Sequence, residues 1–72
     1  PGSRAAIRAR ARRVADDRTA TPSRRADMAY LYAHWVLELG DKSAAASYYK
    51  LSCDLGNQRA CTMVDQISKD VP

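Results

Sequence analysis

The segment from residue 23 to residue 39 carries apolar side chains around almost its whole circumference, and this feature constrains the fold most strongly. At helical spacing the apolar residues fall on two stripes, one of Met28, Leu31, Trp35 and Leu39 and one of Ala29, Tyr32, Ala33 and Val36. A helix that is apolar all round is buried between neighbours. We therefore expect this helix to be sandwiched between other helices, with Trp35 in the core.

Turn signals place further helices around this segment. Gly40 and Gly56 are suited to end helices, because glycine readily adopts the left-handed conformation that follows a helix C-terminus. The residues suited to begin helices are Thr21 with Pro22, Asp41 or Ser43, and Asn57. No stretch alternates between apolar and polar residues as a strand does. The sequence predicts an all-α fold: a helical hairpin, a flanking N-terminal Arg-rich helix, and a C-terminal capping helix with a stripe of Ala60, Met63, Val64 and Ile67.

The chain is small and poor in bulky apolar residues. It has 72 residues, with one tryptophan, four tyrosines and no phenylalanine. A domain of this size buries a modest share of its surface, so its core must be thin. A thin core favours an arrangement in which each helix touches only its neighbours, or one that an adjoining unit or a partner completes.

Basic residues are concentrated near the N-terminus. Residues 4–25 hold eight arginines and two aspartates, whereas the remainder of the chain is mildly acidic. In residues 4–17, Ile7, Ala11 and Val14 fall at helical spacing, which predicts a helix with a narrow apolar stripe. The candidate basic patch consists of Arg4, Arg8, Arg10, Arg12 and Arg13. A block of this kind favours acidic partners, whether nucleic acid, anionic lipid or an acidic protein surface.

These patterns divide the chain into three segments. Residues 1–3, Pro-Gly-Ser, have the composition of a remnant left after removal of an affinity tag, so we expect the chain to be part of a larger protein. Residues 4–22 form the basic helix and its linker, and residues 23–70 form the helical-repeat unit with its capping helix. We expect no membrane span, because the longest apolar run, residues 28–39, is too short to cross a bilayer and includes His34 and Glu38.

The spacing of small and aromatic residues in the hairpin carries a family resemblance. The residues concerned are Ala29, Tyr32, Ala33 and Val36, then Gly40 and Asp41 at the turn, then Ala45, Tyr49 and Ser52, and the run from Tyr48 to Cys61. Over roughly residues 26–67 this pattern resembles the tetratricopeptide-like and SEL-like helical repeats, the latter in their cysteine-rich form. Tyr32 and Ala33 replace the usual Leu-Gly pair, and the hairpin turn is shorter than SEL-like units normally show. The resemblance implies a hairpin unit that binds proteins, and we expect Tyr49 to lie inside the hairpin and Tyr48 against a neighbouring element.

Cys53 and Cys61 are the only cysteines of the chain. In cysteine-rich SEL-like units a cysteine near the end of one unit is bonded to another in the next helix, so the resemblance implies a disulfide between these two. Two buried thiols at a helix contact are the alternative. A disulfide would indicate an oxidising compartment such as the periplasm or the extracellular space, and its absence the cytoplasm. We expect no metal site and no cofactor, because two cysteines and one distant histidine do not complete a zinc site.

In tetratricopeptide-like arrays the first helices line a concave face that binds peptides. By that resemblance the partner-binding residues are Asp27, Tyr30, His34, Leu37 and Glu38. We predict no enzymatic activity, because His34 is the only histidine and no nucleophile motif or glycine-rich loop accompanies it.

Three functions remain open from the sequence. The leading prediction is a docking or adaptor module of a larger protein, with a protein or peptide as partner. One alternative is a nucleic-acid-binding element that uses the Arg-rich residues 4–25, although no aromatic residue lies between these arginines to stack on bases. The other is a small dimerisation domain, in which a second copy completes the thin core.

Overall fold

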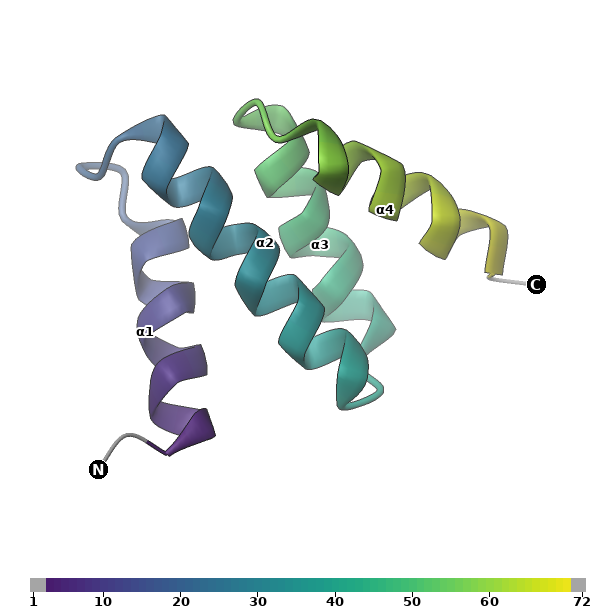
Figure 1. Ribbon diagram of the computed structural model, residues 1–72, viewed down its shortest axis with the longest axis horizontal. Coiled ribbons are helices and arrows are strands. Elements are labelled where there is room, and N and C mark those ends of the chain that lie inside the picture. Colours follow the sequence, from purple (N-terminus) through teal and green to yellow (C-terminus); the bar gives the residue numbers. More distant parts are fainter. Residues whose placement is uncertain (1–2, 71–72) are drawn as a thin grey trace.

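The computed structural model describes residues 3–70, which form four α-helices (Figure 1). The helices are α1 (Arg4–Asp16), α2 (Pro22–Glu38), α3 (Lys42–Asp54) and α4 (Gln58–Asp70). These residues include no strand, so the predicted all-α fold is confirmed. Residues 1–2 of the expected tag remnant lie outside the described residues, but Ser3 caps α1 by accepting a hydrogen bond from the amide of Ala6.

The helices begin and end where local chemistry predicts. Thr21, Asp41 and Asn57 each accept a hydrogen bond from a first-turn amide through a side-chain oxygen, at 3.3, 3.0 and 3.0 Å. Gly40 and Gly56 end α2 and α3 with φ angles of 91° and 109°, which side chains other than glycine rarely adopt. The amides of Asp41 and Asn57 then bond back to helix carbonyls at 2.9 and 3.0 Å. The helices α2 and α3 therefore have the same type of C-terminal end, with a glycine in the left-handed conformation.

Each helix packs on the helix before it and the helix after it (Figure 1). Contacts join α1 to α2, α2 to α3 and α3 to α4, whereas the backbones of non-consecutive helices hardly approach one another. The Cα atoms extend over 38 × 26 × 14 Å, so the molecule is thin in one direction. The prediction that α2 is sandwiched is therefore confirmed, with α1 and α3 as its neighbours. No helix within residues 3–70 has the length and apolarity needed to span a bilayer.

The core lies between α2, α3 and α4. Its buried members are Ala33, Val36, Ala45, Tyr49, Ala60 and Ile67. Tyr49 is the largest fully buried side chain, inside the hairpin as predicted, and its ring meets that of Tyr30 edge to face at 5.5 Å. The buried hydroxyl of Ser52 donates a hydrogen bond of 2.6 Å to the carbonyl of Ala26. This bond joins the end of α3 to the start of α2.

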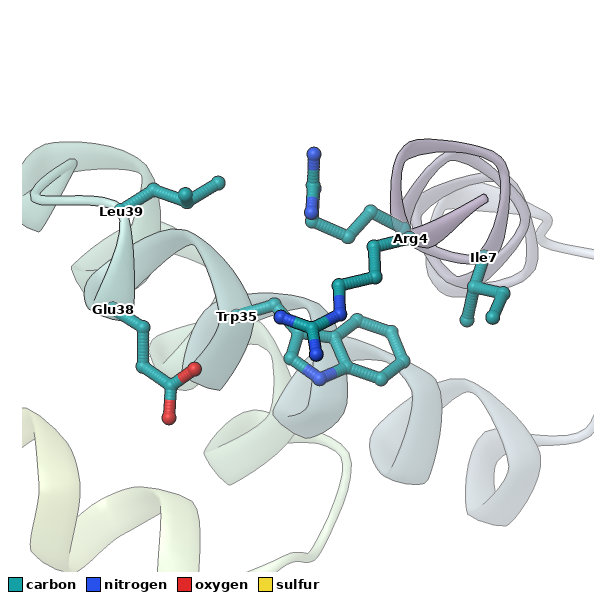
Figure 2. Close-up of a pocket in the computed structure, with 6 residues that line it drawn as sticks. Arg4, Ile7, Trp35, Glu38 and Leu39 are labelled. Carbon is teal, nitrogen blue, oxygen red and sulfur yellow. The ribbon is translucent and has the colours of Figure 1, made fainter. Parts of the chain in front are cut away.

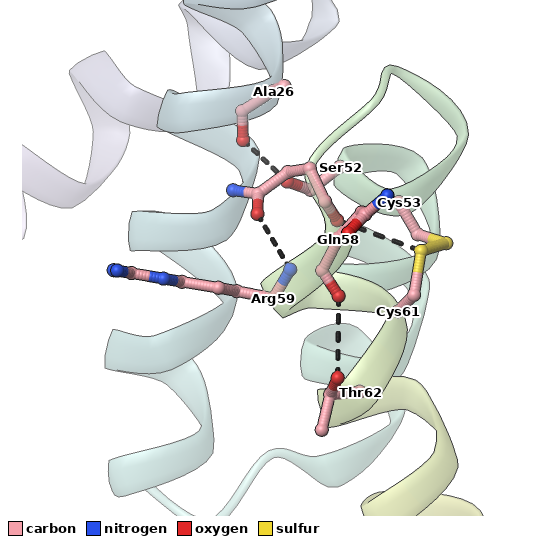
Figure 3. The surroundings of a disulfide bond; sticks show 8 residues. Ala26, Ser52, Cys53, Gln58, Arg59, Cys61 and Thr62 are labelled. Carbon is pink, nitrogen blue, oxygen red and sulfur yellow. Dashed lines mark hydrogen bonds between the residues drawn. A yellow bond between two sulfur atoms is a disulfide. The ribbon is translucent and has the colours of Figure 1, made fainter.

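A disulfide joins Cys53, near the end of α3, to Cys61, in the first turns of α4 (Figure 3). The two Cα atoms are 4.8 Å apart. The bond closes a short loop, and the chain-entropy model gives such a loop a stabilisation of roughly 2 to 3 kcal/mol. The disulfide therefore fixes α4 to α3, the helix on which α4 packs.

The face that α1 turns toward α2 differs from the predicted stripe. Ala11 is buried as expected, but its buried neighbour is Ala15, and Ile7 is 48% exposed. Val14 is partly buried. The difference has a steric reason: two alanines one turn apart let the helix backbones approach closely, which leaves the larger Ile7 outside the contact.

Candidate functional site

The helices α1 and α2 diverge toward the N-terminus of α1 and the C-terminus of α2 (Figure 1). At the closed end, Ala11 and Ala15 of α1 are buried together with Ala26 of α2. At the open end, the large ring of Trp35 lies between the helices (Figure 2). A pocket of about 440 Å³ results there.

Both helices contribute to the lining of this pocket (Figure 2). The lining residues are Arg4, Ile7 and Arg8 from α1, Trp35 and Glu38 from α2, and Leu39 at the C-cap of α2. The prediction that Trp35 lies in the core is wrong, because α1 closes on α2 at the alanine end and leaves the ring partly exposed. Leu39 is 65% exposed, and Leu31 of the same predicted stripe is 38% exposed. This stripe of α2 is therefore only partly covered by the rest of the chain.

Arg4 and Arg8 extend the face with which α1 meets α2. Ala15, Ala11, Arg8 and Arg4 succeed one another at intervals of three or four residues, which keeps them on one side of a helix. Arg8 is partly buried, yet within residues 3–70 neither arginine forms an ion pair. An unpaired charge is costly to bury. The charge of these arginines therefore disfavours a closer approach of the two helices at this end.

Arg12 has a different role from Arg4 and Arg8. Its Nε donates a hydrogen bond of 3.2 Å to the hydroxyl of Tyr48 and lies 3.8 Å from a carboxylate oxygen of Asp16. The Tyr48 hydroxyl in turn lies 3.1 Å from Asp16 as a donor, and its ring packs edge to face on Tyr32 at 4.7 Å. The hydrogen bond to Tyr48 raises the pKa of Arg12, and burial raises the pKa of Tyr48. These polar contacts connect α1 to α3.

The five arginines of the predicted basic patch lie in different surroundings, although Arg8, Arg12 and Arg13 also line a second hollow along α1 together. Arg4 and Arg8 line the pocket, Arg12 binds Tyr48, and Arg10 and Arg13 are exposed.

The linker between α1 and α2 is ordered by contacts that the sequence did not reveal. Arg25 Nε donates a hydrogen bond of 2.9 Å to the carbonyl of Ala15, in the last turn of α1. Asp17 accepts hydrogen bonds from the hydroxyl and the amide of Thr19, at 2.6 and 2.9 Å, and these bonds lower the pKa of Asp17. In the sequence, Arg25 is only one more basic residue of the arginine-rich residues 4–25. The unpaired carbonyls at the end of α1 are the signal that could have identified its role.

The residues predicted to bind a partner on α2 fall into two groups. Asp27, His34 and Glu38 are exposed, and His34 Nε2 lies 3.3 Å from a carboxylate oxygen of Glu38 one turn later. Tyr30 and Leu37 are partly buried and pack against the core. Only Glu38 also lines the pocket between α1 and α2.

Within residues 3–70 no three His, Cys, Asp or Glu side chains are grouped so that they could hold a metal ion. The pocket instead combines an aromatic ring, two aliphatic side chains, the carboxylate of Glu38 and two guanidinium groups that form no ion pair within residues 3–70. No protein-family model, curated protein or solved structure matches this chain.

Proposed function

We propose that the chain is a non-enzymatic protein-docking module. The observation that carries the proposal is the partly uncovered apolar stripe of α2, in which Leu31, Trp35 and Leu39 all keep exposed surface. Ile7 of α1 adds to it across the pocket. Several large apolar side chains exposed together typically mark an interaction surface. A tryptophan among them is the kind of side chain that contributes most to binding between proteins.

The hairpin of α2 and α3 fits one unit of a tetratricopeptide-like or SEL-like array, with α4 as the first helix of the next unit. Three features support this proposal: the small buried residues Ala33 and Ala45 of the hairpin, the aromatic Tyr49 in the same buried cluster, and the disulfide from the second helix to the following one. The packing of each helix on its chain neighbours agrees with such an array. The disulfide also fits an oxidising compartment.

Within this proposal, α2 offers a second surface beside the apolar stripe. Asp27, His34 and Glu38 are free to orient a partner through charge and hydrogen bonds. Tyr30 and Leu37 contribute mainly to the hairpin, because their side chains already pack against buried residues.

The arginines of residues 4–25 give less support to nucleic-acid binding. Arg12 and Arg25 already donate hydrogen bonds to Tyr48 and to the Ala15 carbonyl. Asp16 lies beside Arg12 and reduces the local positive charge. A continuous track of free basic groups, which phosphate binding favours, is therefore interrupted along α1.

Selection of peptides from a phage-displayed library on the immobilised, oxidised chain tests the docking proposal. We expect enriched peptides that bind Leu39→Glu at least about tenfold more weakly, because this change places a charge in the apolar surface. Ser47→Glu, at an exposed position of α3, makes the same change of charge and serves as the control, with affinity retained. The absence of any enriched peptide, or equal binding to Leu39→Glu and the unmodified chain, would contradict the proposal.

Titration of labelled single- and double-stranded oligonucleotides at two salt concentrations tests the nucleic-acid alternative. Micromolar binding that weakens steeply with salt would transfer the function to the Arg-rich helix. We expect no such binding at low salt.

A further inference from the structure

The pocket between α1 and α2 has two chemically different halves. Ile7, Trp35 and Leu39 supply an apolar half, and Arg4 and Arg8 supply a cationic half. Its volume of about 440 Å³ lies within the range of roughly 300 to 1,000 Å³ typical of ligand pockets. The exposed fractions of Ile7 and Leu39 show that the apolar half is open to an incoming side chain.

The cationic half has no counter-ion among the residues that the structure describes. Within residues 3–70, no carboxylate pairs with Arg4 or Arg8. Glu38, on the opposite wall, has its carboxylate 3.3 Å from His34 of its own helix. An external carboxylate could bind the arginines with charge-assisted hydrogen bonds, which are stronger than neutral ones.

We infer that this pocket binds an acidic protein segment that inserts one large aliphatic or aromatic side chain beside Trp35, while its carboxylates bind Arg4 and Arg8. The inference rests on the proposed docking function and specifies the chemistry of the partner. The helix α1 carries five arginines and one aspartate, and this excess of positive charge attracts acidic segments over a distance.

A second copy of the chain fits the pocket less well than an acidic segment. The chain has a formal net charge of +4, and its positive charge is concentrated on the helix that forms one wall of the pocket. Self-association through this pocket would bring the arginine-rich helices of two copies together. Like charges in an interface disfavour that arrangement.

The single tryptophan of the chain reports on the pocket directly, because Trp35 lies in it. The probe is a synthetic peptide of about a dozen residues with a central leucine flanked by glutamates, titrated while Trp35 fluorescence is recorded. Two matched peptides carry glutamine in place of every glutamate, or serine in place of the leucine. We expect saturable binding of the first peptide and at least about tenfold weaker binding of each of the others.

Two double variants of the chain separate the pocket from overall charge. Arg4→Glu with Arg8→Glu removes the cationic half, and we expect about a tenfold or greater loss of affinity for the acidic peptide. Arg10→Glu with Arg18→Glu makes the same change in net charge at exposed positions that do not line the pocket, and we expect less than about a threefold loss. Circular dichroism checks the fold of each variant, and the pair Arg4→Gln with Arg8→Gln replaces the first variant if it does not fold.

Several outcomes would overturn the inference. In the titrations, these are an equal loss of peptide affinity in the two double variants, equal affinity for the acidic peptide and its glutamine counterpart, and a Trp35 fluorescence that does not change saturably. In sedimentation, it is a dimer of the chain that Leu39→Glu dissociates. Oligonucleotide binding that is tighter than peptide binding and needs Arg10 and Arg18 as much as Arg4 and Arg8 would also overturn it. Library peptides without acidic residues that bind independently of Arg4 and Arg8 would end this inference but leave the docking function in place. A library selection that enriches no peptide would contradict both this inference and the docking function.

Discussion

The two sides of α2 are held in different ways. On the side of α3, the contact is built from buried groups: the Tyr49 ring, and the hydrogen bond from the Ser52 hydroxyl to the Ala26 carbonyl. The disulfide then links α3 covalently to α4. On the side of α1, the buried residues that α1 contributes are the small Ala11 and Ala15, and the hydrogen bonds of Arg12 and of the Ala15 carbonyl are exposed or partly buried.

This difference indicates where the chain is stable and where it can adapt. Buried apolar contacts are lost only when the structure opens, whereas exposed hydrogen bonds exchange readily with water. The α2–α3–α4 part therefore serves as the rigid support, and α1 is the helix that can adjust to a bound segment. The pocket lies at the boundary of the two parts, between α1 and α2.

The largest effect is expected at the centre of the rigid part. Tyr49→Ala should lower the free energy of unfolding by about 3 kcal/mol or more, because it leaves a cavity where the largest buried side chain was. For so small a domain, this loss could unfold the chain. Ile7→Ala on α1 is the contrasting change, with an expected effect within about 0.5 kcal/mol. Urea unfolding followed by circular dichroism measures both, and comparable effects of the two changes would erase the contrast between the sides of α2.

The next effect concerns the disulfide. Replacing Cys53 and Cys61 together by serine should lower the free energy of unfolding by about 2 kcal/mol, which corresponds to a fall in melting temperature of roughly 10 °C. Reduction of the unmodified chain should give a similar fall, whereas the serine variant should not respond to reductant. An unchanged melting temperature in the serine variant would show that α4 is held by packing alone.

A smaller effect, of opposite sign, is expected from the Tyr49 hydroxyl. The hydroxyl is buried and has no hydrogen-bond partner within residues 3–70. Tyr49→Phe should therefore raise the free energy of unfolding by about 1 kcal/mol. Burial also raises the pKa of Tyr49 above its ordinary value of 10.0. Ionisation of this hydroxyl is thus disfavoured in the folded chain, so the free energy of unfolding keeps its full value below about pH 10 and falls as pH rises through the folded-state pKa.

The alkaline range gives a second measurement of the same change. Unfolding between about pH 9 and pH 11 should show a steeper loss of stability in the unmodified chain than in Tyr49→Phe. Tyr48 remains in both chains, and its own raised pKa contributes equally to both. Destabilisation by Tyr49→Phe at neutral pH would mean that the hydroxyl has a bonding partner after all.

The helices could be predicted closely because their ends depend on local chemistry. Thr21, Asp41 and Asn57 are caps, and Gly40 and Gly56 are helix ends, by virtue of neighbouring residues alone. The burial of Tyr49 in the hairpin also followed from helical spacing. The packing between helices was harder to predict, because periodicity shows that a stripe is apolar but not how closely a neighbouring helix approaches it.

The pocket could not be predicted for that reason. Its geometry depends on Ala11 and Ala15 drawing α1 against one end of α2, which leaves Trp35 exposed at the other. The basic block was recognised as a unit, but the sequence could not show that Arg8 lines a pocket while Arg12 bonds to a tyrosine of α3. Such roles depend on contacts between residues far apart in the chain.

The smallest effect is expected at the polar link between α1 and α3. Tyr48→Phe removes the hydroxyl that bonds to Arg12 and Asp16, and both of these partners are exposed enough to bond to water instead. The free energy of unfolding should therefore fall by only about 0.5 kcal/mol. Hydrogen exchange should nevertheless quicken in α1 and remain unchanged in α3 and α4, because α1 alone loses an attachment. Faster exchange throughout the chain would show that α1 unfolds together with the hairpin and is not the adaptable side of the molecule.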